Sequence, residues 1–168
     1  MSGYGDGNFG PNDTTTRAML AMILWNLEGQ PSAEGGASFN DVPANEWYAS
    51  AVRWASAQGI ISGYDDPSAS GRVFDPNAPV TREQLAAMLY RYARMKGIDV
   101  SASGDLAVFT DGSSVSGYAQ DAMAWARGAG LVNGSEDLNG NRVLEPGAAS
   151  SRAVVATIFM RYCTDVAK

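Results

Sequence analysis

Apolar residues recur at helical spacing in five stretches of the chain, and each stretch begins or ends at a recognisable helix signal. The pattern predicts helices over 17–27, about 47–58, 82–95, about 118–129, and from 152 onward. The stretch 17–27 is apolar almost all round, which is typical of a helix inside a bundle. Loops rich in Gly, Pro, Ser and Asp separate the helices. The sequence therefore predicts an all-α fold built from helix-loop-helix units.

One motif precedes three of these helices. It has an apolar residue, a proline two positions later and an arginine eight positions later, and its copies begin at Phe9, Phe74 and Leu144. In the middle copy, Thr81 is the expected N-cap and Gln84 its capping-box partner. Thr16 and Ser151 are expected to cap the other two helices. Three matches at one spacing indicate an internal repeat.

The rest of the chain repeats with the same period. Phe109 follows Phe39 by 70 residues, and Tyr118, Trp125, Gly130 and Gly134 take the places of Trp47, Trp54, Gly59 and Gly63 at 71. This divides the chain into residues 3–36, 37–103 and 104–168. The first of these holds only the second half of a repeat, because the front half that begins at Phe39 and Phe109 has no counterpart before Gly3.

Each motif arginine, Arg17, Arg82 and Arg152, falls at the first position of its helix. The helix dipole disfavours a cation there by roughly 0.3–1 kcal/mol. A helix start with free N–H groups attracts anions, and an arginine beside it adds a planar fork suited to carboxylate or phosphate. Alternatively, each arginine pairs with an acidic residue of a neighbouring repeat and only holds the repeats together. The residues alone leave both interpretations open.

Composition removes several classes of function. The net charge is −6, with 12 Lys and Arg against 18 Asp and Glu, which argues against nucleic acid or an anionic membrane surface as the main partner. No apolar run is long enough for membrane insertion. A single Cys and no His exclude a disulfide framework, the usual zinc sites and His-based triads. We expect no cofactor, no metal and no enzymatic activity.

Two further groups of residues have more than one interpretation. Trp47 and Tyr118 begin helices beside Asp41 and Asp111, and an aromatic face with nearby polar groups suits a sugar. They could equally be core, which is the role we expect for Trp54 and Trp125. The segment 137–141 alternates oxygen ligands as a calcium loop does, but Arg142 and Ala148 break the EF-hand pattern, so an Asx-rich turn is expected.

Together these residues resemble the S-layer homology domain over nearly the whole chain. The similarity rests on the Phe39-x-Asp41-Val42 start, the Gly63-Tyr64 pair, the Gly3-to-Pro11 segment, and the tetrads that begin at Thr16, Thr81 and Ser151. The resemblance implies a pseudo-threefold, trefoil-like arrangement of repeats. It also implies a binding module at the bacterial cell surface that holds a surface protein non-covalently on secondary cell wall polysaccharide, often pyruvylated, linked to peptidoglycan. Each tetrad keeps the arginine of the family's Thr-Arg-Ala-Glu and loses its terminal Glu.

The resemblance gives a set of expected polysaccharide-binding residues: Arg17, Arg82, Arg152, Thr81, Trp47, Tyr118, Asp41, Asp111, Gly63 and Tyr64. The alternative function is a structural or assembly module that contacts other protein domains without binding carbohydrate. We also expect the incomplete first repeat to leave apolar surface on 17–27 uncovered. This predicts either self-association through that repeat or marginal stability of its helix.

Overall fold

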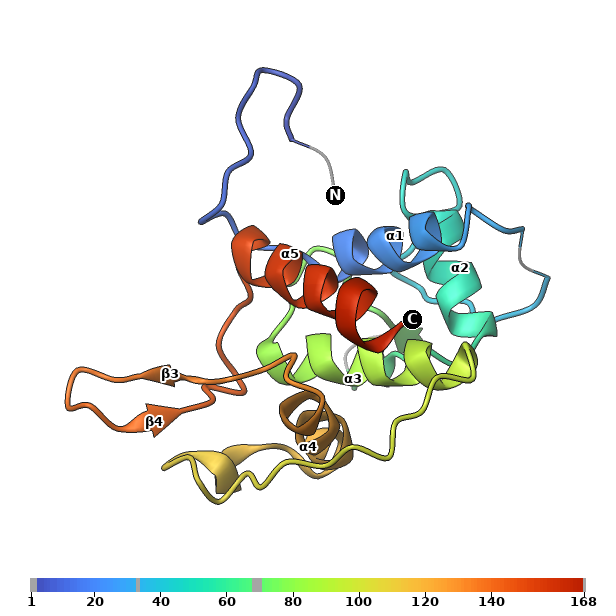
Figure 1. The fold of residues 1–168 in the computed structure, drawn as a ribbon. Coiled ribbons are helices and arrows are strands. Elements are labelled where there is room, and N and C mark those ends of the chain that lie inside the picture. The colour runs from blue at the N-terminus through green and yellow to red at the C-terminus, as the bar shows by residue number, and fades with distance from the viewer. Residues whose placement is uncertain (1–2, 33, 68–70, 168) are drawn as a thin grey trace. The chain divides into compact units, whose positions relative to one another are not determined.

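The computed structural model describes residues 3–32, 34–67 and 71–167. These residues form mainly helices, which confirms the predicted class (Figure 1). The α-helices are α1 (Arg17–Leu27), α2 (Ala49–Ala57), α3 (Arg82–Met95), α4 (Gln120–Gly128) and α5 (Arg152–Arg161). Short helical turns are η1 (Gly112–Ser114), η2 (Gly117–Ala119) and η3 (Tyr162–Val166).

Two small hairpins were not expected from the sequence. In the described residues the strands form two antiparallel pairs, β1 (Tyr64–Asp65) with β2 (Arg72–Val73) and β3 (Ser135–Glu136) with β4 (Arg142–Val143). Each strand is two residues long, too short to show an alternating pattern. The hairpins occupy equivalent places in the second and third repeats, immediately before the motif.

The predicted helix starts are confirmed. The hydroxyls of Thr16, Thr81 and Ser151 each accept a hydrogen bond from the backbone N–H three residues later. At α3 the Gln84 side chain also accepts from the Thr81 N–H at 3.1 Å, which completes the capping box. These caps are local, so the sequence alone was enough to predict them.

The chain divides into a larger unit, Met1–Thr14 with Thr81–Lys168, and a smaller unit, Thr15–Val80. In the smaller unit α1 packs on α2, and Trp54 is 3% exposed. In the larger unit α3 packs on α4, and Trp125 is 1% exposed. The core role expected for both tryptophans is confirmed. The division into three repeats and their pseudo-threefold arrangement stay predictions.

One packing rule corrects an expectation. The front helix of a repeat covers the rear helix of the preceding repeat, because α2 lies on α1 and α4 lies on α3. We expected the missing front half to uncover part of 17–27, but α2 already covers α1. By the same rule, a front helix of the first repeat would lie on α5. Leu27 is nevertheless 47% exposed at the end of α1.

Candidate functional site

The three motif arginines make the same contact in all three copies. Each donates a hydrogen bond to the main-chain carbonyl of the apolar residue that begins another copy. The pairs are Arg17 Nε with Phe74 O at 2.7 Å, Arg82 Nη1 with Leu144 O at 2.9 Å, and Arg152 Nε with Phe9 O at 2.8 Å. The first copy thus contacts the second, the second contacts the third, and the third contacts the first. Sequence spacing had related each arginine only to its own copy.

The helix N-termini beside these arginines are not free to bind an anion. The first two N–H groups of each helix donate to carbonyls of the partner copy at 2.8–3.0 Å. For α3 the acceptors are Ala148 and Pro146; α1 and α5 use the equivalent residues. The third N–H is bonded to the cap hydroxyl. The expectation of free N–H groups was therefore wrong, and an anion here would have to be held by side chains.

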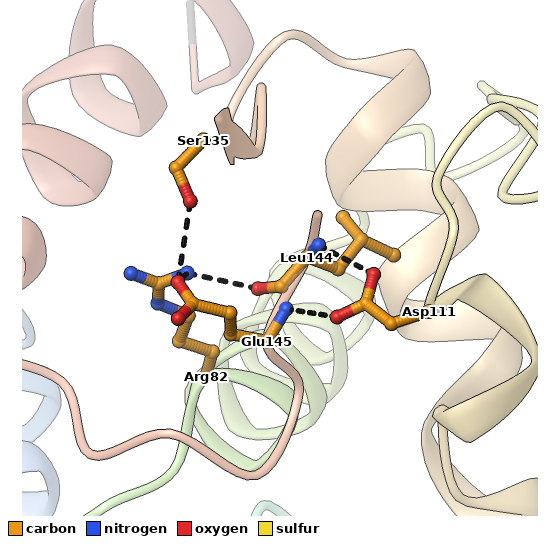
Figure 2. Close-up of polar contacts among 5 residues, drawn as sticks. All are labelled: Arg82, Asp111, Ser135, Leu144 and Glu145. Atoms are coloured by element: carbon orange, nitrogen blue, oxygen red, sulfur yellow. Dashed lines mark hydrogen bonds and ion pairs between the residues drawn. The ribbon is translucent and has the colours of Figure 1, made fainter. Parts of the chain in front are cut away.

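Arg82 also forms an ion pair with the partner copy. Its Nη1 lies 2.7 Å from Glu145 Oε2, with the two side chains 24% and 47% exposed. Ser135 Oγ donates to the same carboxylate oxygen at 3.2 Å (Figure 2). The interpretation of the arginine as a contact between repeats thus describes one real role of Arg82. Because this pair is partly exposed, the guanidinium also remains accessible to solvent.

Arg17 and Arg152 lie against aromatic rings. The Arg17 guanidinium carbon is 4.7 Å from the centre of the Phe74 ring, and that of Arg152 is 4.6 Å from Tyr4 and 4.8 Å from Phe9. Arg152 is only 7% exposed. Leu144 cannot provide a ring at the third copy, and there the guanidinium pairs with Glu145. Arg82 is therefore the more accessible of the two motif arginines in the larger unit.

A pocket of about 290 Å³ opens beside Arg82 in the larger unit. Its walls are residues 131–135, Leu144 and one face of α5 that includes Val154, Ile158 and Arg161. Arg161 Nη1 donates to Leu131 O at 3.0 Å. The pocket thus combines apolar walls with two guanidinium groups, a combination suited to a small ligand that carries an acidic group.

Sequence reasoning missed Arg161 and the 131–135 loop. A signal was present, since Val154, Ile158 and Arg161 recur at spacings of four and three residues and so share one helix face. Nothing in the sequence, however, indicated that this face lines a pocket shared with Arg82. That juxtaposition comes from contacts between different repeats.

The two front aromatic residues lie on the surface. Trp47 is 57% exposed and Tyr118 is 55% exposed, so neither is core. The Tyr118 hydroxyl donates to Glu83 Oε1 at 3.0 Å, beside Arg82 at the start of α3. Glu83 is buried and also accepts from the N–H and hydroxyl of Ser116, at 3.0 and 2.8 Å. The structure therefore brings Tyr118 to the same helix start as Arg82.

Asp41 and Asp111 clamp the start of the motif. Asp111 accepts from the N–H groups of Leu144 and Glu145, both at 2.7 Å (Figure 2), and Asp41 does the same for Phe74 and Asp75, at 2.9 and 2.6 Å. Both carboxylate oxygens are used in each case. These contacts give the two aspartates a structural role; their predicted contact with polysaccharide stays a prediction.

The clamped residues have an unusual backbone. Asp75 and Glu145 have φ of 56° and 51°, in the left-handed region that side chains other than glycine seldom adopt. Gly10 stands at the equivalent place in the first copy with φ of 62°. The aspartate clamp therefore stabilises a turn that aims the preceding carbonyl at the arginine of another copy.

The remaining predicted residues have local roles. Thr81 is used as the cap of α3, and the Tyr64 hydroxyl, on a side chain 45% exposed, donates to Asp75 Oδ2 at 3.2 Å. At Gly63, which has φ of 61°, a Cβ atom would lie 2.3 Å from the Phe39 ring. Glycine is thus required there by packing. Whether these three residues contact ligand stays a prediction.

The 137–141 segment is an Asx-rich turn, as expected. Asp137 Oδ1 accepts from the N–H groups of Asn139 and Asn141, both at 2.8 Å, and Oδ2 accepts from the Asn141 amide at 2.9 Å. These bonds, chiefly those from Asn141, lower the pKa of Asp137. In the part of the chain that the structure describes, no three His, Cys, Asp or Glu side chains are grouped to hold a metal.

With this geometry in view, comparison with known proteins identifies the class. The family model of the S-layer homology domain matches residues 1–19, 38–86 and 108–139, more than half of the chain. The chain belongs to this family. The S-layer homology domain is a non-catalytic anchoring module of cell-surface proteins.

Among similar proteins, the surface-layer 125 kDa protein of Lysinibacillus sphaericus is 34% identical over 99% of this chain and 13% of its own length. The amylopullulanase of Thermoanaerobacterium thermosulfurigenes is 33% identical over 95% of this chain and 8% of its own. The cellulosome-anchoring protein of Acetivibrio thermocellus is 29% identical over 58% of this chain and 22% of its own. The chain thus spans less than a quarter of each of these proteins.

The family and the surface proteins among its relatives place the chain at the bacterial cell surface. Among the described residues, no helix is both long enough and apolar enough to cross a membrane.

Proposed function

We propose that this chain anchors a surface protein to the cell wall by binding an acidic, pyruvylated sugar of secondary cell wall polysaccharide linked to peptidoglycan. The observation that carries the proposal is the pocket beside Arg82, where Arg82 and Arg161 border one apolar space. A pyruvylated sugar presents a carboxylate together with the apolar face of a ring. Arginine provides planar paired donors for the carboxylate, and the apolar walls suit the ring.

The proposed pocket is suited to one acidic group rather than to a diffuse polyanion. The protein carries a net charge of −6, so attraction over long distances is unfavourable. The two guanidinium groups are fixed by backbone carbonyls, Arg82 by Leu144 O and Arg161 by Leu131 O. Such fixed donors reduce the ordering cost of binding.

The proposal includes a role for Tyr118. Its exposed ring lies at the start of α3, next to the residue that bears the guanidinium, and is held there by its bond to Glu83. A ring fixed in this way can contact a second sugar of the polymer by stacking. Trp47 takes the equivalent place before α2.

A second candidate function is a module that assembles with other protein domains without binding carbohydrate. It is favoured by the contact of all three motif arginines with backbone carbonyls of other copies. These contacts already give the arginines a structural use.

Pull-down with purified cell wall sacculi separates the two functions. Wild-type protein is mixed with sacculi before and after the secondary polymer has been chemically stripped. The proposal expects binding that is lost on stripping and is weakened by Arg161→Ala. The matched control is Arg94→Ala, which removes an exposed arginine on α3 outside the pocket. Equal binding to stripped sacculi, or no effect of Arg161→Ala, would favour the assembly function.

A further inference from the structure

The face of α5 formed by Ala153, Ala156, Thr157 and Met160 is open where the equivalent faces of α1 and α3 are covered. In α3, which precedes α5 by 70 residues, the equivalent residues are Glu83, Ala86, Ala87 and Tyr90. The first three of these are at most 9% exposed, and the Tyr90 ring meets Trp125 of α4 edge-on at 5.5 Å. In α5, Thr157 is exposed and Met160 is 57% exposed.

The difference follows the packing rule of the repeats. α1 is covered by α2 and α3 by α4, whereas no described helix covers α5 in the corresponding position. Two of the four open residues are alanines, which permit close approach of a second helix. Met160 is a flexible apolar side chain that makes favourable contacts with aromatic rings. The face thus has the character of the covered faces of α1 and α3.

We infer that this α5 face is the docking surface for a third front helix, located in the polypeptide immediately before Gly3. The chemistry of that helix can be taken from α2 and α4, which share a pattern of Ala, then Val or Met, any residue, Trp and Ala (51–55 and 122–126). Its tryptophan would lie on Met160 as Trp125 lies on Tyr90. Its alanines would face Ala153 and Ala156.

The path of the chain supports this source. The segment from Gly3 to Phe9 is equivalent to the segment from Gly134 to Leu144, which follows α4 directly. It lies at the beginning of α5, where Phe9 O accepts from Arg152 and Thr14 forms a bridge with Ser151. A helix placed just before Gly3 would therefore start from the same position relative to α5 that α4 has relative to α3. The relatives, which are several times longer than this chain, show that such sequence exists around the domain in other proteins.

The test adds the missing element from the chain's own sequence. A second copy of residues 104–133 is placed directly before Gly3, so that the added copy ends where Gly134 normally follows. The reporter is Cys163, the single cysteine, which is exposed and lies three residues after Met160. Ala93, at the equivalent position of α3, is fully buried. We expect the rate of thiol modification to fall about tenfold or more in the extended chain, since the thiol must then wait for local opening.

Two matched variants show whether the docking is specific. Replacing the tryptophan of the added copy by Glu, and separately Met160→Glu, should each restore the reactivity of Cys163. Leu138→Glu, which changes a fully exposed apolar residue of the β3–β4 loop, should not. Circular dichroism of the unextended Met160→Glu chain checks that α5 still forms.

Two results would overturn the inference. One is equal Cys163 reactivity in the extended and unextended chains, or equal protection by the Trp→Glu copy. The other is a dimer of the unextended chain, seen by light scattering, that Met160→Glu converts to monomer. In that case the face is covered by a second copy of this chain and not by a preceding segment. Neither result depends on polysaccharide binding.

Discussion

One residue type at three equivalent positions has three different surroundings. Arg152 is buried against the rings of Tyr4 and Phe9, Arg17 lies over Phe74, and Arg82 is partly exposed beside Glu145. The shared part is the hydrogen bond to a backbone carbonyl. The variable part is the residue that begins the partner copy, since phenylalanine supplies a ring and Leu144 does not.

Arg152→Ala should destabilise the protein more than Arg82→Ala. The first change removes a buried, charge-assisted hydrogen bond and leaves the Phe9 carbonyl without its donor, a loss of about 1.5–3 kcal/mol. The second removes a partly exposed ion pair and carbonyl contact, worth about 1 kcal/mol. Urea unfolding measures both free energies. An equal loss would mean that burial does not distinguish the two sites.

Glu145→Gln should strengthen binding to the acidic polysaccharide. Glu145 occupies the Arg82 guanidinium that the ligand's carboxylate would use, and glutamine keeps the size but not the charge. Because exposed ion pairs contribute at most about 1 kcal/mol, the gain should be up to about fivefold. Calorimetric titration with an isolated polymer fragment measures it. Weaker binding would show that Glu145 instead holds Arg82 in its binding orientation.

At the scale of elements, the helices and their caps were predictable because they depend on residues three or four apart. Thr81 with Gln84 is one example. The contacts of the site join residues about 60 or more apart, such as Arg82 with Leu144, and no local pattern encodes which copy is the partner. Trp54 and Trp125 could be assigned to the core from helix spacing. The exposure of Trp47 and Tyr118 could not, because it depends on the packing of whole helices.

Asp111→Ala should loosen the motif turn of the third repeat. The change removes the acceptor for the N–H groups of Leu144 and Glu145, and it leaves Glu145 at a positive φ without its clamp. We expect a loss of about 2–3 kcal/mol in the free energy of unfolding, measured in urea. Asp121→Ala, in the exposed first turn of α4, is the matched control and should cost much less. Similar losses would contradict the clamp.

The β3–β4 hairpin should open at low pH. The pKa of Asp137 lies below its usual 3.8, chiefly through hydrogen bonds from Asn141. Because the folded pKa is lowered, the stabilisation is present above the unfolded pKa and is lost as pH falls through the folded value. Carboxyl titration by NMR should place Asp137 below 3.8, and Asn141→Ala should move it upward. A titration at 3.8 or above in the wild type would refute the turn contacts.

At the scale of the whole molecule, the net charge of −6 and the small number of local arginines predict how binding responds to its surroundings. Steering over long distances is unfavourable, so affinity should depend on the formed pocket and change only modestly with ionic strength. Removing the acidic substituent from the polysaccharide should weaken binding far more than raising the salt to about 0.5 M. Binding assays with acidic and neutral polymer test this. Equal binding to the neutral polymer would contradict the anion assignment.

The exchange of hydrogen bonds between copies also limits how such a chain can change in length. In a solenoid each repeat contacts its neighbours in line, so evolution can add or remove repeats at either end. Here the third copy donates to the first, and each helix start has its donors satisfied by one partner only. Deleting one copy would leave a helix start with buried donors and no acceptor, and inserting a fourth would separate a pair that now meets. Duplication of this domain is therefore expected to proceed in complete sets of three, never one motif at a time.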